Sequence, residues 1–233
     1  MRFEPQLIHG VLIQRYKRFL ADIRLDSGVE ITAHCPNPGS MKTCAEPGWE
    51  VWVSPANNPK RKLKWTLELI VSPTARILVN TQRPNALVAE AVLAQEIQSL
   101  AEYTTLKREV PYGNKSRIDL LLCEPSRPDC YVEIKNVSML HKPGVAAFPD
   151  SVTKRGTKHL HELVDMVKDG HRAVQFFLVS RTDVDCVVPA EDIDPTYAEA
   201  LRWAAGQGVE VIAHQTIISE KELTVGEAIP VLL

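Results

Sequence analysis

One stretch, residues 117–139, constrains the fold more than any other, because it places ionisable side chains inside otherwise apolar strands. An aliphatic run around Asp119 is followed by a second aliphatic run around Glu133 and Lys135. The segment between them, residues 124–130, contains two prolines, a serine and an aspartate, which favour a turn. We therefore predict two strands joined by this turn. Glu133 and Lys135 should share one face, because side chains alternate along a strand.

The charged groups in these strands need a physical reason, because an unpaired charge in a protein core costs several kcal/mol. A magnesium ion supplies one, since Mg²⁺ prefers carboxylate oxygens and keeps several waters, and Asp119 and Glu133 are the predicted ligands of Mg²⁺ or Mn²⁺. Lys135 would orient or deprotonate an attacking water and balance the charge of a phosphate. The alternative is a salt-bridged hairpin in which Lys135 neutralises both acids.

Length and composition place the chain among ordinary globular proteins. Its 233 residues suffice for one large domain or two small ones, and 45% of them are hydrophobic. There is no apolar run long enough to span a membrane, and the N-terminal residues do not resemble a signal peptide. The five cysteines form no CxxC pair, which favours a reducing cytoplasm and argues against a zinc ribbon.

The net charge of −2 is unevenly distributed along the chain. Basic side chains outnumber acidic ones in residues 1–80, whereas acidic side chains predominate in residues 181–233. This asymmetry is typical of a molecule with one side that faces a polyanion.

The first part of the chain reads as short strands separated by polar loops. The predicted strands cover residues 10–14, 19–25, 29–34, 49–54, 65–72 and 76–80. Strands of this length and number predict a small closed β-barrel, and the oligonucleotide-binding barrel is the obvious member of that class.

Two clusters in this region interleave cations with aromatic residues, a pattern in which cations track phosphates while aromatic faces stack bases. The clusters contain Arg15, Lys17 and Arg18 beside Tyr16 and Phe19, and Lys60, Arg61, Lys62 and Lys64 beside Trp65. A solvated loop with a core aromatic residue explains each cluster equally well. Between the clusters, the loop of residues 36–42 is rich in Pro, Asn and Gly, so its backbone N–H groups could bind an anion.

From residue 85 the hydrophobic period changes from two to 3.6. Asn85 is the predicted cap of a helix over residues 86–101, and Glu90 lies on or near its apolar stripe. Ordinary surface exposure is the alternative explanation for Glu90. The segment 140–156 is rich in Pro, Gly and small residues, and we expect it to form a loop over the site.

A second helix is predicted over residues 157–169. Basic or potentially basic side chains crowd its N-terminus, where acids are more usual because of the helix dipole: Lys154, Arg155, Lys158 and His159. This cluster points to a bound anion. An apolar strand over 172–180, a helix over 195–205 and a strand over 209–218 complete an α/β arrangement.

Several long motifs of the chain resemble the bacterial and archaeal sugar fermentation stimulation protein A family. They are AHCPNPGSM (33–41), RIDLLL (117–122), VEIKNVSM (132–139), FPDSVTKRG (148–156) and KHLHEL (158–163). The resemblance covers essentially the whole chain. It implies an oligonucleotide-binding barrel, residues 1–80, followed by a restriction-endonuclease-like domain of the PD-(D/E)XK class, residues 81–233.

The resemblance also implies roles for individual residues. Asp119 would be the strand aspartate of the nuclease, Glu133 its second carboxylate and Lys135 its lysine. Glu90 would take the place of the helix acid that many such nucleases use as a third or outer metal ligand. Ile118 stands where the literal PD pair has proline, a variation that leaves the metal site intact.

Two functions from different classes follow from these residues. The first is a nuclease that depends on Mg²⁺ or Mn²⁺ and cuts DNA or RNA without sequence preference, because it contacts phosphates rather than base edges. The second is a DNA-binding regulator of sugar metabolism without catalytic activity. A sugar-handling enzyme rests on the family name alone, and both a monomer and a homodimer remain open.

Overall fold

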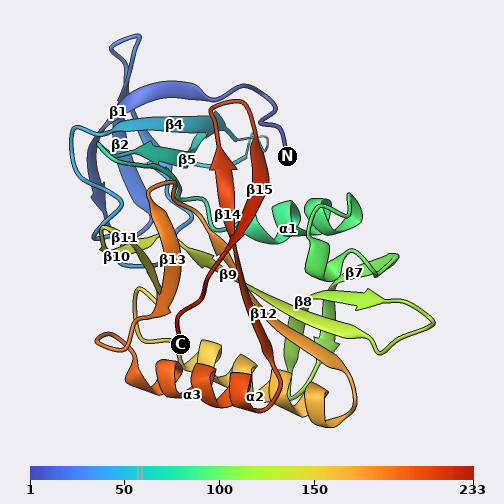
Figure 1. Ribbon diagram of the computed structural model, residues 1–233. Helices are drawn as coiled ribbons and strands as arrows, with labels where there is room; N and C mark the ends of the chain where they lie inside the picture. The colour runs from blue at the N-terminus through green and yellow to red at the C-terminus, as the bar shows by residue number, and fades with distance from the viewer. Residues whose placement is uncertain (57, 59) are drawn as a thin grey trace.

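The computed structural model describes residues 1–56, 58 and 60–233. Figure 1 shows a β-barrel packed against a larger mixed-sheet domain. The barrel is built from β1 (Ile8–Tyr16), β2 (Leu20–Leu25), β3 (Glu30–His34), β4 (Glu50–Pro55), β5 (Trp65–Val71) and β6 (Arg76–Leu78). Their order is β3-β2-β1-β4-β5-β6, and a parallel contact between β3 and β5 closes the barrel. All of the strands predicted in this region are confirmed.

Alternating side chains fill the barrel, as a period of two requires. Ile23 from β2, together with Val51 and Val53 from β4, lies in its core. The intervening Asp22 and Trp52 are directed elsewhere and are more exposed. The apolar residues of the alternating sequence pattern therefore face the interior and form the barrel core.

The second domain is organised around a mixed sheet of order β15-β14-β12-β9-β8-β7. Its strands are β7 (Thr105–Tyr112), β8 (Ser116–Cys123), β9 (Cys130–Val137), β12 (Arg172–Val179), β14 (Glu210–Ile218) and β15 (Leu223–Ile229). β12 runs parallel to β9 and β14, whereas β7, β8 and β15 pair antiparallel to their neighbours. β8 and β9 are the two strands predicted around the charged residues, and β7 and β15 extend the predicted sheet.

Helices cover both faces of this sheet. On one face, α1 (Pro84–Leu93) packs against the side chains of Ile134 and Phe176. On the other face, α2 (Lys154–Lys168) and α3 (Pro195–Gly206) pack against Phe177. Figure 1 shows α2 and α3 lying side by side across the bottom of the sheet. Glu133 and Lys135 lie on the strand between these layers.

The expectation of a loop over residues 140–156 is wrong for most of its length. The chain forms β10 (Met139–Lys142) and β11 (Gly144–Phe148), and β11 pairs in parallel with β13 (Val184–Pro189), which the sequence pattern did not indicate. Small residues such as Ala146 and Ala147 are buried in this sheet. Because alanine is only weakly hydrophobic, the sequence pattern did not predict this strand.

The first helix ends earlier than predicted, and Asn85 is not its cap. α1 begins at Pro84, Arg83 precedes it without a side-chain cap bond, and Leu93 is its last residue. Gln95 adopts a φ of 58°, which a continuous helix does not accommodate, and a 3₁₀ turn follows at Gln98–Leu100. The second helix begins earlier than predicted, at Lys154 rather than at residue 157.

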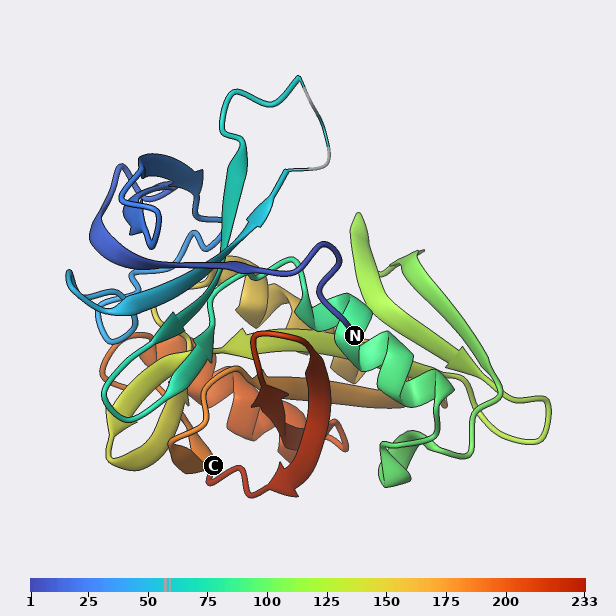
Figure 2. The ribbon, with the colours of Figure 1, turned by 90° about the horizontal axis from the view of Figure 1, so that it is seen from above.

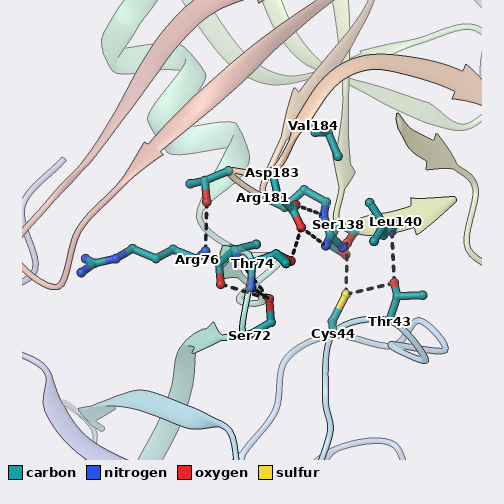
Figure 3. Close-up of polar contacts among 12 residues, drawn as sticks. Thr43, Cys44, Ser72, Thr74, Arg76, Ser138, Leu140, Arg181, Asp183 and Val184 are labelled. Atoms are coloured by element: carbon teal, nitrogen blue, oxygen red, sulfur yellow. Dashed lines mark hydrogen bonds and ion pairs between the residues drawn. The ribbon is translucent and has the colours of Figure 1, made fainter. Parts of the chain in front are cut away.

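Polar contacts join the barrel to the second domain (Figure 3). Arg181, which is 1% exposed, donates to Ser138 O at 2.9 Å and forms an ion pair with Asp183 at 2.6 Å. Asp183 accepts a hydrogen bond of 2.6 Å from Thr74 of the barrel, and Cys44 Sγ donates to Ser138 O at 3.0 Å. The barrel is therefore fixed against the strand that carries the charged residues. No helix in the described part of the chain is long and apolar enough to cross a membrane.

Candidate active site

Asp119 lies where β8 and β9 part. The two strands pair through Leu120–Val132 and onward toward their shared turn, but no ladder pair extends to Asp119. Its carboxylate instead accepts a hydrogen bond of 2.7 Å from the backbone N–H of Ile134. The side chain thus replaces the missing strand partner, and the fork between the strands becomes a polar site within an apolar sheet.

Asn85 holds the other oxygen of Asp119. Its Nδ2 donates to Asp119 Oδ1 at 2.7 Å, from the first turn of α1. Burial and the nearby charge of Glu133 raise the pKa of Asp119 to about 6. The ionised form of Asp119 is therefore costly in this protein unless a cation lies beside it.

Glu133 is almost fully enclosed, with 2% of its surface exposed. Its Oε1 accepts from Lys135 Nζ at 2.6 Å and is in close contact with His159 Nδ1. Burial acts to raise the pKa of Glu133, but the hydrogen bond with His159 and the charge of Lys135 outweigh burial and hold the pKa below its usual value. Glu133 is ionised at neutral pH.

The proton on His159 can be placed from its partners. Nε2 accepts from Arg155 Nε at 3.2 Å, so the proton of the neutral ring lies on Nδ1 and is donated to Glu133. Lys135 Nζ lies 3.4 Å from the same Nδ1. Arg155, His159 and Glu133 thus form one connected chain from α2 to β9.

The structure brings Asp119, Glu133 and Lys135 together, and it places Glu90 elsewhere. Glu90 is on the exposed side of α1, where it pairs with the N-terminal amine of Met1 at 3.1 Å. Figure 2 shows the start of the chain running beside α1. The α1 residue that contacts Asp119 is Asn85. The sequence predicts its amide to be a helix cap and gives no sign of the contact with Asp119.

The donor set fits a hydrated divalent cation held by two carboxylates. Within the described residues, no group of three or more His, Cys, Asp or Glu side chains is arranged to hold a metal. One oxygen of the pair is nevertheless conspicuous, because Glu133 Oε2 is buried and has no hydrogen-bond partner in the described part of the chain. A buried carboxylate oxygen without a partner is costly, and a cation would satisfy it. Mg²⁺, which keeps several waters, requires few protein ligands.

Two buried tyrosines place further polar groups near Glu133. The hydroxyls of Tyr112 and Tyr197 also have no hydrogen-bond partner among the described residues. Burial, reinforced by the negative charge of Glu133, raises the pKa of both phenols, so they remain neutral donors. Sequence reasoning missed both residues, because a single tyrosine among polar neighbours gives no sign of burial beside a distant carboxylate.

The salt-bridge alternative is realised only in part. Lys135 pairs with Glu133, but none of the ion pairs among the described residues joins Lys135 to Asp119. Asp119 is held by neutral donors instead. One acid of the site therefore lacks a cationic partner at hydrogen-bond distance.

The predicted nucleic-acid contacts on the barrel divide into two kinds. Arg15 is turned inward, and its guanidinium donates to the carbonyls of Asn37, Gly39 and Ser40. The exposed cations are Lys17 and Arg18 in the β1–β2 turn and Lys60, Lys62 and Lys64 between β4 and β5. Arg61 is half-buried in that second turn and donates to Thr66 at 3.1 Å. Residues 57 and 59 of the predicted basic turn lie outside the described residues.

The Pro- and Gly-rich loop of residues 36–42 already binds an anionic group of the protein itself, the carboxylate of Asp150. The backbone N–H of Ser40 donates to Asp150 Oδ2 at 3.0 Å. A Cβ added at Gly39 would overlap this carboxylate, so glycine is required for the close approach. The loop is a contact between the barrel and the segment that leads into α2.

At the start of α2 the predicted cations also differ from one another. Lys154 and Arg155 are exposed, whereas His159 is buried against Glu133. Lys158 Nζ is committed to the β7–β8 turn, donating to Asn114 O at 2.6 Å and to Ser116 Oγ at 2.9 Å. Of the four cations predicted to touch an anion, Lys154 and Arg155 therefore remain in position to do so.

Comparisons with known proteins agree with this architecture. Residues 13–80 match the family described as "SfsA N-terminal OB domain", and residues 82–222 match "Sugar fermentation stimulation protein RE domain". The chain is 49% identical to a "Sugar fermentation stimulation protein homolog" of Acidithiobacillus ferrooxidans over 98% of both chains. It is 51% identical to that of Paramagnetospirillum magneticum over 97% of this chain and 95% of the other.

A solved structure has the same fold. It is described as "The structure of Pyrococcus Furiosus SfsA in complex with Ca2+", and it superposes with a TM-score of 0.88 at 24% identity, covering 100% of this chain and 98% of that chain. The barrel is thus of the oligonucleotide-binding type, and the mixed-sheet domain follows it as in that protein. The chain belongs to the sugar fermentation stimulation protein family.

Proposed function

We propose that this protein is a divalent-metal-dependent nuclease that cuts nucleic acid without sequence preference. The observation that carries the proposal is the fork between β8 and β9, where Asp119 and Glu133 lie with Lys135. There Glu133 Oε2 is buried and has no hydrogen-bond partner among the residues that the structure describes. Perturbed carboxylates next to a lysine are typical of a catalytic site.

In this proposal Asp119 and Glu133 hold the metal, which is Mg²⁺ or Mn²⁺. The relative from Pyrococcus furiosus was solved with Ca²⁺, which supports a divalent-cation site in this chain as well. Bound there, the cation would act as a Lewis acid on a phosphate and stabilise the charge that develops during hydrolysis. The raised pKa of Asp119 supports this assignment, because a neighbouring cation would favour its ionised form.

The remaining residues of the site have separate roles. Lys135 orients the attacking water and compensates the charge of the phosphate, from a position fixed by its ion pair with Glu133. His159 donates its Nδ1 proton to Glu133 and keeps that carboxylate ionised and oriented. Asn85 orients Asp119 in the same way. His159 and Asn85 are positioning residues.

The barrel, residues 1–80, would bind the strand, and the second domain, residues 81–233, would cut it. Lys17, Arg18 and the basic turn between β4 and β5 are exposed cations on the barrel, in keeping with contacts to phosphates. Such contacts carry no base information, so cleavage without sequence preference is expected. Both DNA and RNA are candidate substrates, and the cytoplasm is the proposed location.

The experiment is a cleavage assay on labelled single-stranded DNA, double-stranded DNA and RNA, each with Mg²⁺, with Mn²⁺ and with EDTA. Wild type should cut at least one substrate in a metal-dependent way, and Asp119→Ala should not. A pure, folded preparation that cuts none of them, beside an active control nuclease, would sink the proposal.

One observation favours the second candidate, a nucleic-acid-binding regulator without catalysis. Glu90 does not reach the site, so the third acid implied by the resemblance is missing from it. A pure binder should retain its affinity for DNA in Asp119→Ala, or bind more tightly as negative charge is removed. The same set of variants therefore separates the two candidates.

A further inference from the structure

A cleft of about 280 Å³ lies between the β7–β8 turn and the start of α2. Its lining includes the cations Lys115, Arg117, Arg155 and Lys158, and Glu109 is its one carboxylate in the described structure. His159 also lines it, so the cleft adjoins the proposed catalytic site through the contact between His159 and Glu133. Cations gathered around a concave surface focus a positive potential there.

The β7–β8 turn, which carries Lys115 and leads into Arg117 of β8, is fixed against α2. Glu162 accepts from the backbone N–H of Asn114 at 2.9 Å and pairs with Lys158 at 3.3 Å, while Lys158 donates to Asn114 O. Gly113 has a φ of 53°, and a Cβ there would run into Glu162. The turn is therefore packed closely against the helix, and Lys115 is its last residue.

The two arginines of the cleft are held by neutral groups rather than by acids, as far as the described residues show. In the part of the chain that the structure describes, Lys115, Arg117 and Arg155 form no ion pair with a carboxylate. Arg117 donates to the carbonyl of Glu109 at 2.7 Å, and Arg155 donates to His159. Each guanidinium uses one N–H group in this way and keeps others for a ligand, and such forks match the oxygens of a phosphate.

We propose that this cleft binds a backbone phosphate of the nucleic-acid strand, with Lys115 and Arg117 on one side and Arg155 on the other. The inference rests on the proposed function and extends it, since it assigns a substrate contact to the β7–β8 turn. The bound phosphate is a neighbour of the one that is cut, because His159 separates the cleft from Glu133. Through Arg155 and His159, the cleft is connected to the proposed metal-binding carboxylate.

The test is the salt dependence of binding, measured in EDTA so that no cleavage takes place. Fluorescence anisotropy with a short labelled single-stranded DNA gives the slope of log K against log salt concentration for wild type and for Lys115→Ala/Arg117→Ala. Each phosphate contact on a single strand contributes about 0.7 to this slope, so loss of the one phosphate in the cleft should lower its magnitude by about 0.7 in the double variant. Both side chains are exposed, so the variant should fold.

A matched control removes the same charge from two elements that flank the cleft. Lys107→Ala/Lys168→Ala takes one exposed cation from β7 and one from the last turn of α2, and neither lines the cleft. Its slope should equal that of wild type. Arg117→Lys keeps the charge and should keep most of the slope, although the bond to Glu109 O is lost.

The outcomes separate the phosphate cleft from the nuclease proposal. A wild type that binds DNA with a slope that Lys115→Ala/Arg117→Ala leaves unchanged overturns the cleft alone. So does a control variant that lowers the slope equally, because charge loss anywhere would then suffice. A wild type that binds no nucleic acid overturns both proposals.

Discussion

Replacing Asp119 with asparagine should stabilise the metal-free protein while abolishing its proposed function. The folded protein raises the pKa of this carboxyl from 3.8 to about 6, through burial and the charge of Glu133. A difference of about two pKa units is equivalent to about 3 kcal/mol of folding free energy, because each unit corresponds to about 1.4 kcal/mol. Asparagine is nearly the same shape, and its oxygen can still accept from Ile134 N while Asn85 turns its own oxygen toward the new amide.

The direction of the pKa change determines the pH range in which Asp119 affects stability. The folded state holds the Asp119 proton more tightly than the unfolded state, so its contribution to stability is complete below pH about 4 and is lost as the pH rises through about 6. The asparagine of the variant does not titrate. The stability difference between Asp119→Asn and wild type should therefore grow between pH 4 and pH 6 and then level off at about 2 to 3 kcal/mol in favour of the variant.

Thermal and urea unfolding in EDTA, over a pH series, would measure this difference. For a chain of this size each kcal/mol corresponds to about 2–4 °C, so at neutral pH the variant should melt roughly 5 to 10 °C above wild type. Asp165→Asn, at an exposed carboxyl on α2, is the control, and it should change stability by less than about 0.5 kcal/mol. A variant that is less stable than wild type at pH 7, or a difference that does not depend on pH, would refute the reasoning.

Two further predictions concern the metal and the contact between the domains. Mg²⁺ or Mn²⁺ at about 100 times its dissociation constant should raise the free energy of unfolding of wild type by about 2.7 kcal/mol, and EDTA should reverse this gain. The metal should have little effect on the stability of Asp119→Asn. An equal gain in the variant would argue against a metal site at this residue. Gly39→Ala should destabilise the protein by about 1.5–3 kcal/mol in urea, because the new Cβ displaces Asp150 from the backbone N–H of Ser40. Gly206→Ala, in open space at the end of α3, should be neutral or stabilising, and an equal loss in both variants would contradict this account.

The fold was predictable wherever the hydrophobic period was strong. The barrel strands and the two strands around the charged residues alternate clearly, and β12 is largely apolar, so the sequence predicts each of these strands. β11 and β13 were missed because small residues and the exposed positions of an outer sheet weaken the pattern. The predicted length of α1 was wrong because Ile97 and Leu100 keep a helical spacing and are buried, although Gln95 breaks the helix before them.

The centre of the candidate site was predictable, and its surroundings were not. Asp119, Glu133 and Lys135 stand out because ionisable residues in apolar strands are rare. His159 was expected to touch an anion and in the structure contacts the carboxylate of Glu133. Asn85 was read as a helix cap because asparagine serves both purposes. Periodicity says which face a residue takes, but it does not say which distant residue meets it there.

The roles of the cations could not be predicted for the same reason, because a sequence does not show which distant residues a side chain contacts. Exposed and committed cations look alike in a sequence, yet Arg15 binds three backbone carbonyls and Lys158 holds a turn. The sequence does not single out Lys115 and Arg117, because they are far from α2 along the chain. The turn of β7–β8 brings them to the helix, and a sequence pattern alone cannot supply that contact.

The central claim is that Asp119, Glu133 and Lys135 act together in metal-dependent hydrolysis, and the single-turnover cleavage rate tests it most directly. The rate should be measured with enzyme in excess over a labelled strand in Mn²⁺, for wild type, Glu133→Gln, Lys135→Ala and the control Lys107→Ala. We expect Glu133→Gln and Lys135→Ala to cut at least about 100-fold more slowly than wild type, with Lys107→Ala unchanged. Cleavage by both site variants at the wild-type rate, or no metal-dependent cleavage by wild type, would contradict the claim.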